Sequence, residues 1–247
     1  MMNSFRQMFI SAIGCAISFF LLGLVPAHAT IITAGCANVN SSCTLSELYS
    51  GGTISVNDVV FDNWLETLND GGLDAATVSV SGVDEVVDGG DPTKSTLGLS
   101  FLANPSLSFD FLEYDFDFDV SFNPTGRMLT RADLELVSFL LGGADFEFVE
   151  VNADLTAALL SVDQDSTTSS AALTSLTSLT ADFDIQMEAE NDDGPVPTPP
   201  SLSQFDFTLQ VMRPNGPNPV PEPSTLLLLG VGLLGLARGH WRAVTTR

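Results

Sequence analysis

The sequence predicts an all-β protein, with a single antiparallel β-sandwich ectodomain flanked by an N-terminal signal helix and a short C-terminal transmembrane helix. Three observations lead to this prediction. Apolar and polar residues alternate with a period of two through most of the chain, as in strands with one buried face. Turn-forming residues separate these short runs, which is typical of a sandwich. Long apolar runs occur only near the two ends of the chain.

The first apolar run has the features of a secretory signal peptide. A basic residue precedes the uncharged stretch 8–25, and Ala27 and Ala29 then form a small-residue cleavage signal. We therefore expect a signal peptide over residues 1–29 and a mature chain that begins at Thr30. The alternatives are an uncleaved membrane anchor or lipid attachment at a cysteine inside the run.

The clearest strand covers residues 112–122, where aromatic and aliphatic residues alternate with acids and serine. This pattern predicts one buried face and one wet face. Residues 123–126 carry a type I turn signature, with proline at i+1 and glycine at i+3. The run 134–139 is expected to pair back as a hairpin. The run 145–151 also alternates, with a predicted bulge at Val149.

Further strands are expected on both sides of this region. They are predicted at residues 55–61, 77–83, 96–101 and 155–162. The strands 182–190 and 204–211 are expected to close the domain as a pair. The Ser/Thr-rich stretch 161–180 is interpreted as a mobile loop plus a polar strand, or alternatively as an acceptor of O-glycans.

The aromatic residues are expected to form the core. Most of the 17 phenylalanines fall at inward strand positions, and burying one contributes about 1.5–3 kcal/mol. Trp64 has two interpretations, as a core residue or as an exposed ring that stacks on a ligand.

Two cysteines, Cys36 and Cys43, remain after removal of the signal peptide. An even pair in an exported chain predicts a disulfide, and two free thiols are the alternative. The bond would close a small loop and contribute about 2–3 kcal/mol by tying down the N-terminal segment. Without a histidine, the pair is a poor zinc site.

The charge of the ectodomain excludes several classes of function. All 31 acidic residues lie between positions 30 and 223, where four basic residues oppose them, so this segment carries a net charge of −27. Such a domain repels nucleic acid and anionic lipids and attracts divalent cations. Its only lysine is Lys94, and both histidines lie in the terminal segments. Catalytic pairs that use histidine are therefore excluded, and among common hydrolytic designs only paired carboxylates remain.

Three aspartates are the candidate metal ligands. Asp115, Asp117 and Asp119 occupy alternate positions of the clearest strand, so their side chains share one face about 7 Å apart. Calcium, which takes six to eight oxygen ligands, would relieve their repulsion. The alternative is a solvated acidic face that keeps an edge strand from pairing with other chains. No other cofactor is expected.

The C-terminal segment combines three features in order. A Pro-rich linker at 214–220 leads to a Pro-Glu-Pro element, the apolar run 226–237 follows, and a basic tip at 238–247 begins with Arg238. The uninterrupted apolar run is short compared with the about 20 residues of an ordinary membrane span. The residues of the first element are Val220, Pro221, Glu222, Pro223 and Ser224.

This tail, residues 221–247, resembles the sorting domain of PEP-CTERM proteins of Gram-negative bacteria. The resemblance implies a membrane processing enzyme of the exosortase type as a partner, with cleavage near the Pro-Glu-Pro element. It also implies an association with exopolysaccharide. The ectodomain, residues 30–213, combines an early Cys-x6-Cys pair (36–43), a Phe-Asp-Asn-Trp segment (61–64) and a Tyr-Asp-Phe-Asp-Phe strand (114–118). In this arrangement it looks like a recurring PEP-CTERM ectodomain whose role is undefined.

These observations lead to one main hypothesis and two alternatives. We expect a non-enzymatic protein that is exported, anchored in the membrane by its tail and then placed at the cell surface or in the extracellular matrix with exopolysaccharide. The first alternative is a calcium-dependent adhesion or carbohydrate-binding module. The second is a glycosidase that uses two carboxylates.

Overall fold

The computed structural model describes residues 31–38, 42–87, 91, 93–122, 127–191 and 198–212. Residues Ala29–Gly216 form one compact unit. The predicted signal peptide, linker and sorting tail lie outside the described residues, as does the turn expected at 123–126. Within the described ranges, no helix has the length and apolarity needed to cross a membrane.

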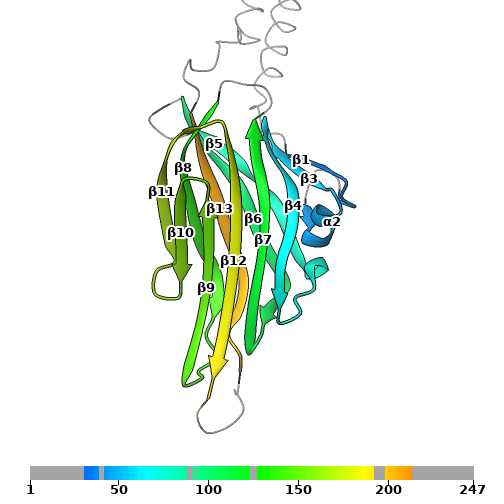
Figure 1. Cartoon of the computed structure of the whole chain (residues 1–247), viewed down its shortest axis with the longest axis vertical. Coiled ribbons are helices and arrows are strands. Elements are labelled where there is room, and N and C mark those ends of the chain that lie inside the picture. Colours follow the sequence, from blue (N-terminus) through cyan, green and yellow to red (C-terminus); the bar gives the residue numbers. More distant parts are fainter. Residues whose placement is uncertain are drawn as a thin grey trace, which may run out of the picture. The chain divides into compact units, whose positions relative to one another are not determined.

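Two antiparallel sheets form the domain, as the sequence predicts (Figure 1). The seven-stranded sheet contains, in spatial order, β1 (Ile31–Ala34), β3 (Thr53–Val56), β4 (Val59–Asp70), β7 (Phe111–Phe122), β12 (Ser178–Glu190), β9 (Phe146–Leu155) and β10 (Ala158–Asp163). The six-stranded sheet contains β11 (Thr168–Leu176), β8 (Met128–Leu140), β13 (Ser201–Met212), β6 (Lys94–Ser108), β5 (Val78–Val87) and β2 (Ser42–Thr44).

Aromatic side chains from both sheets fill the space between the layers. The ring of Phe101 on β6 stacks on Phe205 of β13 at a centroid distance of 4.5 Å. Phe183 on β12 approaches Phe205 at 6.1 Å and so joins the two sheets. Aromatic pairs of this kind add about 0.5–1.5 kcal/mol to the gain from area burial. The inward residues predicted for residues 112–120 and 204–211 are buried in this core.

A short helix and a disulfide fix the N-terminal segment. Helix α2 (Leu45–Tyr49) begins after Thr44, whose hydroxyl accepts a hydrogen bond from the backbone N–H of Glu47, while the Glu47 carboxylate accepts one from the backbone N–H of Thr44. This reciprocal capping satisfies two backbone donors. The predicted disulfide between Cys36 and Cys43 is present. The single-turn 3-10 helix η1 (Ala75–Thr77) precedes β5.

Two segments that the sequence predicts as single strands are hairpins. Residues 55–61 are split between β3 and β4, because Asn57 adopts a left-handed backbone conformation (φ 57°) and reverses the chain. Residues 155–162 are split between β9 and β10, with Leu155 opposite Ala158. Asn tolerates positive φ better than other residues with a side chain. Alternating polarity continues across both turns and hides them.

The two strand pairings predicted from nearness in sequence are wrong. Strand β7 lies in the seven-stranded sheet and β8 in the six-stranded sheet, so the run 134–139 does not pair back on 112–122. Strands β12 and β13 are likewise in different sheets. Both connections pass from one layer to the other. Alternation predicts which face of a strand is buried, but it does not identify the partner of the strand.

The predicted bulge at Val149 is also wrong. Strand β9 pairs with β12 in unbroken register from Phe146 to Leu155. Val149 and Val151 are buried, so Phe146 and Phe148 lie on the outer face instead of the core. Phe111, at the start of β7, lies on the same face. We call these three residues, Phe111, Phe146 and Phe148, the phenylalanine patch.

Candidate functional site

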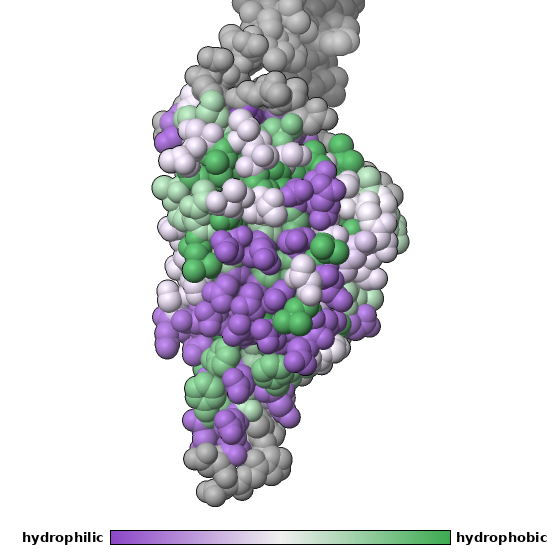
Figure 2. Space-filling model, in the orientation of Figure 1, coloured by the Kyte–Doolittle hydropathy of each residue, from purple (hydrophilic) through white to green (hydrophobic). Residues whose placement is uncertain are grey.

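The outer face of the seven-stranded sheet carries acidic side chains on three adjacent strands. Two rows cross β7, β12 and β9, the first formed by Asp117, Asp182 and Asp154 and the second by Asp115, Asp184 and Asn152. Figure 2 shows a hydrophilic band across this face, with hydrophobic patches at its margins and below it. Neighbouring strands are about 4.8 Å apart, so each row places like charges in close proximity.

Asp115 and Asp184 are opposite each other on neighbouring strands. One carboxylate oxygen of each residue, Oδ1, is buried and has no hydrogen-bond partner. Burial raises the pKa of Asp115 to about 6, with further contributions from the charge of Asp184 and from the hydrogen bond that a protonated Asp115 would donate to Asp184. Asp115 therefore loses its proton near pH 6, well above the ordinary value of 3.8.

The same two causes act on the neighbouring carboxyl groups. Burial raises the pKa of Asp182, and the charges of Asp154 and Asp184 raise it further. Burial also raises the pKa of Asp117, with added repulsion from Asp182 and Asp119. Burial and the repulsion of neighbouring charges therefore raise the pKa of Asp115, Asp117 and Asp182 alike.

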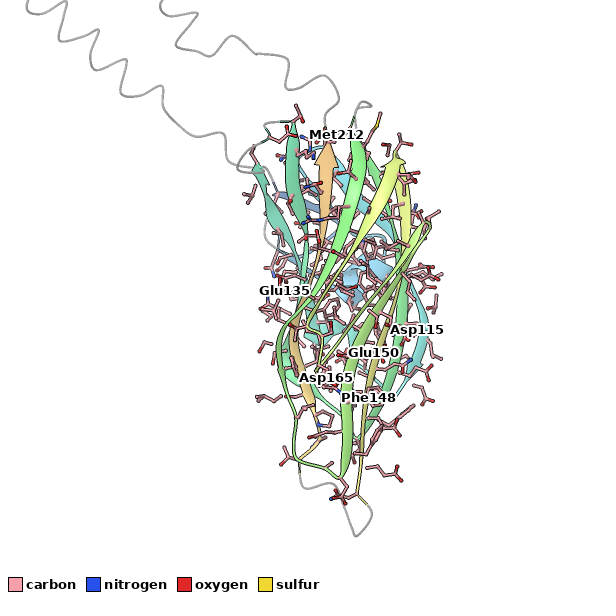
Figure 3. All side chains as sticks on the ribbon, turned by 90° about the vertical axis from the view of Figure 1, so that its left-hand side faces the viewer. Asp115, Glu135, Phe148, Glu150, Asp165 and Met212 are labelled. Carbon is pink, nitrogen blue, oxygen red and sulfur yellow. A yellow bond between two sulfur atoms is a disulfide. The ribbon has the colours of Figure 1, made fainter. Side chains whose placement is uncertain are left out.

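A shallow groove of about 490 Å³ runs along this acidic face. Its size lies in the range of small-molecule sites. Carboxylates, an amide, a hydroxyl and one apolar side chain line it. We call it the acidic groove, and its residues are Asp115, Glu150, Asn152, Asp154, Leu159, Ser161, Asp182 and Asp184. Two labelled members, Asp115 and Glu150, lie on the same side of the domain as Phe148 in Figure 3, and Glu135 lies on the opposite side.

The three predicted calcium ligands have different surroundings. Only Asp115 lines the groove. Asp119 accepts hydrogen bonds from Asn63 Nδ2 at 3.0 Å and Thr180 Oγ1 at 2.6 Å, so neutral donors already satisfy it. Among the residues that the structure describes, no cluster of three or more histidine, cysteine or acidic side chains is arranged to hold a metal ion. Since β7 pairs on both sides, with β4 and β12, its acids do not protect a sheet edge.

Most of the groove could not be identified from the sequence. Asp182 and Asp184 alternate with buried residues of β12, but their contact with Asp115 depends on the pairing of β12 with β7. Glu150 and Asp154 come from β9, on the other side of β12. In the sequence, the only indication of these residues is that acids alternate with apolar residues along each strand. The strand order that brings them together is a property of the folded chain.

Trp64 belongs to the core, which is the first of its two interpretations. Its side chain is 5% exposed. The ring stacks on Phe118 at 4.3 Å, and its indole N–H donates to the backbone carbonyl of Phe61. A buried ring with a satisfied donor has no free face for a ligand, so the alternative of ligand stacking is wrong.

The signal-cleavage residues and the tail lie outside the described residues. The chain is of the exported, tail-sorted class: residues 219–242 match the family model of the PEP-CTERM protein-sorting motif. The chain therefore carries a PEP-CTERM sorting tail, which indicates export, C-terminal membrane anchoring and processing by a membrane enzyme of the exosortase type. No curated protein matches the chain.

Proposed function

We propose that this protein is a non-enzymatic glycan-binding protein of the cell surface or extracellular matrix, and that it binds exopolysaccharide through the acidic groove. The observation that supports this is the composition of the groove. Its carboxylates accept hydrogen bonds from hydroxyl groups, Asn152 both donates and accepts, and Leu159 offers an apolar contact. A hydroxyl-rich ligand with apolar C–H faces is complementary to this lining.

The test is co-sedimentation of the full chain, in detergent, with exopolysaccharide from the producing organism, in calcium and in chelator. We expect the protein to pellet with the polymer, and Asn152→Ala to reduce the bound fraction. Asp206→Asn is the matched control, because Asp206 lies on β13 of the other sheet, where it accepts hydrogen bonds from Ser100 and Gln204. If wild type stays in the supernatant under both conditions, glycan binding is disproved.

The unpartnered oxygens of Asp115 and Asp184 favour a second candidate, calcium-dependent adhesion. Two facing carboxylates without counter-charges are what a bound cation would stabilise. In that case, calcium should raise the melting temperature and Asp184→Asn should abolish the increase. An unchanged melting temperature up to about 10 mM calcium, above the Kd of extracellular calcium modules, would eliminate this candidate.

The raised pKa of Asp115 leads to a third candidate, a carboxylate glycosidase. A general acid in such enzymes needs a raised pKa, but the second carboxyl must stand about 5–5.5 Å or 6.5–9.5 Å away to admit the sugar. Asp115 and Asp184 are close enough to share a hydrogen bond, which supports the non-enzymatic proposal. Release of reducing ends from the host polymer would overturn that proposal.

A further inference from the structure

The phenylalanine patch continues the acidic groove along the sheet. Phe111 and Phe146 are 47% and 53% exposed. The rings of Phe146 and Phe148 meet edge to face with centroids 5.8 Å apart. On β9, Phe148 is two residues from the groove residue Glu150, so both side chains are on one face about 7 Å apart. The groove and the patch therefore form one continuous surface.

Carboxylates lie between the rings of the patch. Glu188 on β12 is opposite both Phe111 on β7 and Phe148 on β9, and Glu190 is opposite Phe146. Glu188 thus has a phenyl ring on each neighbouring strand, and Glu190 has one on β9. A cation placed there would meet a carboxylate and also the negative face of a ring, which attracts ammonium groups. A neutral or anionic group would gain less.

No basic residue of the described chain neutralises this face. The described basic side chains pair elsewhere, Lys94 with Asp91, Arg127 with Asp58 and Arg131 with Asp133. With a net charge of −27 between positions 30 and 223, a second copy of the domain would be repelled. Charge complementarity therefore favours a positively charged partner.

The strands that carry the patch have neighbours on both sides. In the order β4-β7-β12-β9-β10, the strands β7, β12 and β9 are hydrogen-bonded to a neighbouring strand on each side. An extended peptide that binds by adding a strand needs a free sheet edge. Recognition at the patch must instead use side chains alone. Rings and carboxylates suit a polymer that presents C–H faces, hydroxyl groups and amines.

The patch lies at the end of the domain away from Met212, the last residue that the structure describes. Met212, the last described residue before the tail, pairs with Met128, at the end where β7 finishes. Phe111 is at the opposite end of β7, and Figure 3 shows Phe148 well below Met212. Strand β13 alone spans about 40 Å, since each residue advances about 3.3 Å. The patch is therefore distant from the C-terminal end of the described strands.

From these observations we infer that the phenylalanine patch binds an amine-bearing glycan, a polymer that contains free amino sugars, with its ammonium groups held beside Glu188 and Glu190. The inference rests on the proposed function and specifies the class of polymer. It also excludes an acidic polysaccharide as the ligand of this surface, because the acidic rows would repel it.

The test measures binding of glucosamine oligomers to the full chain in detergent by calorimetry, with their fully N-acetylated forms as the neutral control. We expect the amine form to bind at least about tenfold more tightly. Replacing one ring should weaken binding about two- to fivefold, since cation–π contacts at exposed sites contribute about 0.5–1 kcal/mol. Phe111→Ala combined with Phe146→Ala should therefore weaken binding about 4- to 25-fold.

Two further variants make the test specific. Glu188→Gln keeps the shape of the side chain and should weaken only the amine form. Leu102→Ala is the matched control, because Leu102 is 46% exposed on β6 of the other sheet. Unchanged binding in Glu188→Gln or in the phenylalanine double variant would overturn the inference. So would tighter binding of oligolysine that depends on the same residues, since the partner would then be a basic protein.

The outcomes also separate this inference from the proposed function. If the host exopolysaccharide pellets the protein but glucosamine oligomers do not bind, the amine specificity is wrong and glycan binding stands. If neither binds, both are wrong.

Discussion

At the scale of the residue, the facing carboxyl groups of Asp115 and Asp184 make the stability of the fold depend on pH. The pKa of Asp115 is raised from 3.8 to about 6 in the folded chain. The folded state therefore binds this proton more tightly than the unfolded state. The resulting penalty is present in full above about pH 6, and it disappears as the pH falls toward the unfolded value. Acidification toward pH 5 should thus relieve the repulsion within the pair.

Asp184→Asn should stabilise the protein at pH 8 by about 0.2–1 kcal/mol, the size of a cross-strand charge effect. The substitution removes one of two facing charges and supplies an amide N–H that can donate to the unpartnered oxygen of Asp115. Thermal unfolding at pH 8 and pH 5 measures this, and the gain should be smaller at pH 5. Asp206→Asn should give no gain, because Asp206 already accepts hydrogen bonds. Equal gains at both pH values would contradict the repulsion argument.

At the scale of secondary-structure elements, β6 and β13 depend on one close backbone approach. A Cβ atom at Gly98 would overlap the carbonyl oxygen of Phe207 and lie 2.7 Å from the Cα of Thr208. Both strands are central in the six-stranded sheet and pair along 11 registered positions, so neither can easily move away. Only glycine permits this spacing.

Gly98→Ala should therefore destabilise the protein by about 3 kcal/mol or more, at the upper end of overpacking effects. The midpoint of urea unfolding measures the change. Gly51→Ala is the control, since its Cβ would meet nothing within 4 Å and only its positive φ of 96° resists the change, at a cost of about 1–2 kcal/mol. Equal midpoints for the two variants would show that the backbone contact is not limiting.

The secondary-structure elements differ in how well the sequence predicts them. Alternation correctly predicted the buried face of β7, because inward and outward residues differ strongly in polarity there. It failed at Phe146 and Phe148, because these apolar residues lie on the outer face of the sheet, where alternation predicts polar residues. It also missed the turn at Asn57, because the hairpin depends on one backbone angle. The acidic groove needs the order of β7, β12 and β9, and long-range pairing has no local signature.

At the scale of the whole molecule, the chain combines an acidic β-sandwich domain with a PEP-CTERM sorting tail. The PEP-CTERM motif covers residues 219–242, which follow the last described strand. The apolar run 226–237 would extend about 18 Å as a helix, less than the about 30 Å of a bilayer core. Such a short segment suits temporary anchoring before processing more than a permanent span.

Deleting residues 221–247 should move the protein from the membrane fraction into the periplasm or the medium, because the deletion removes the apolar run and the basic residues that retain its end at the cytoplasmic face. Fractionation of cells followed by immunoblotting measures this. Glu222→Gln is the control, since it alters the Pro-Glu-Pro element but keeps the apolar run. That variant should remain in the membrane in unprocessed form. If the deleted and intact proteins fractionate identically, the tail does not anchor the chain, and the location proposed for the glycan-binding face loses its basis.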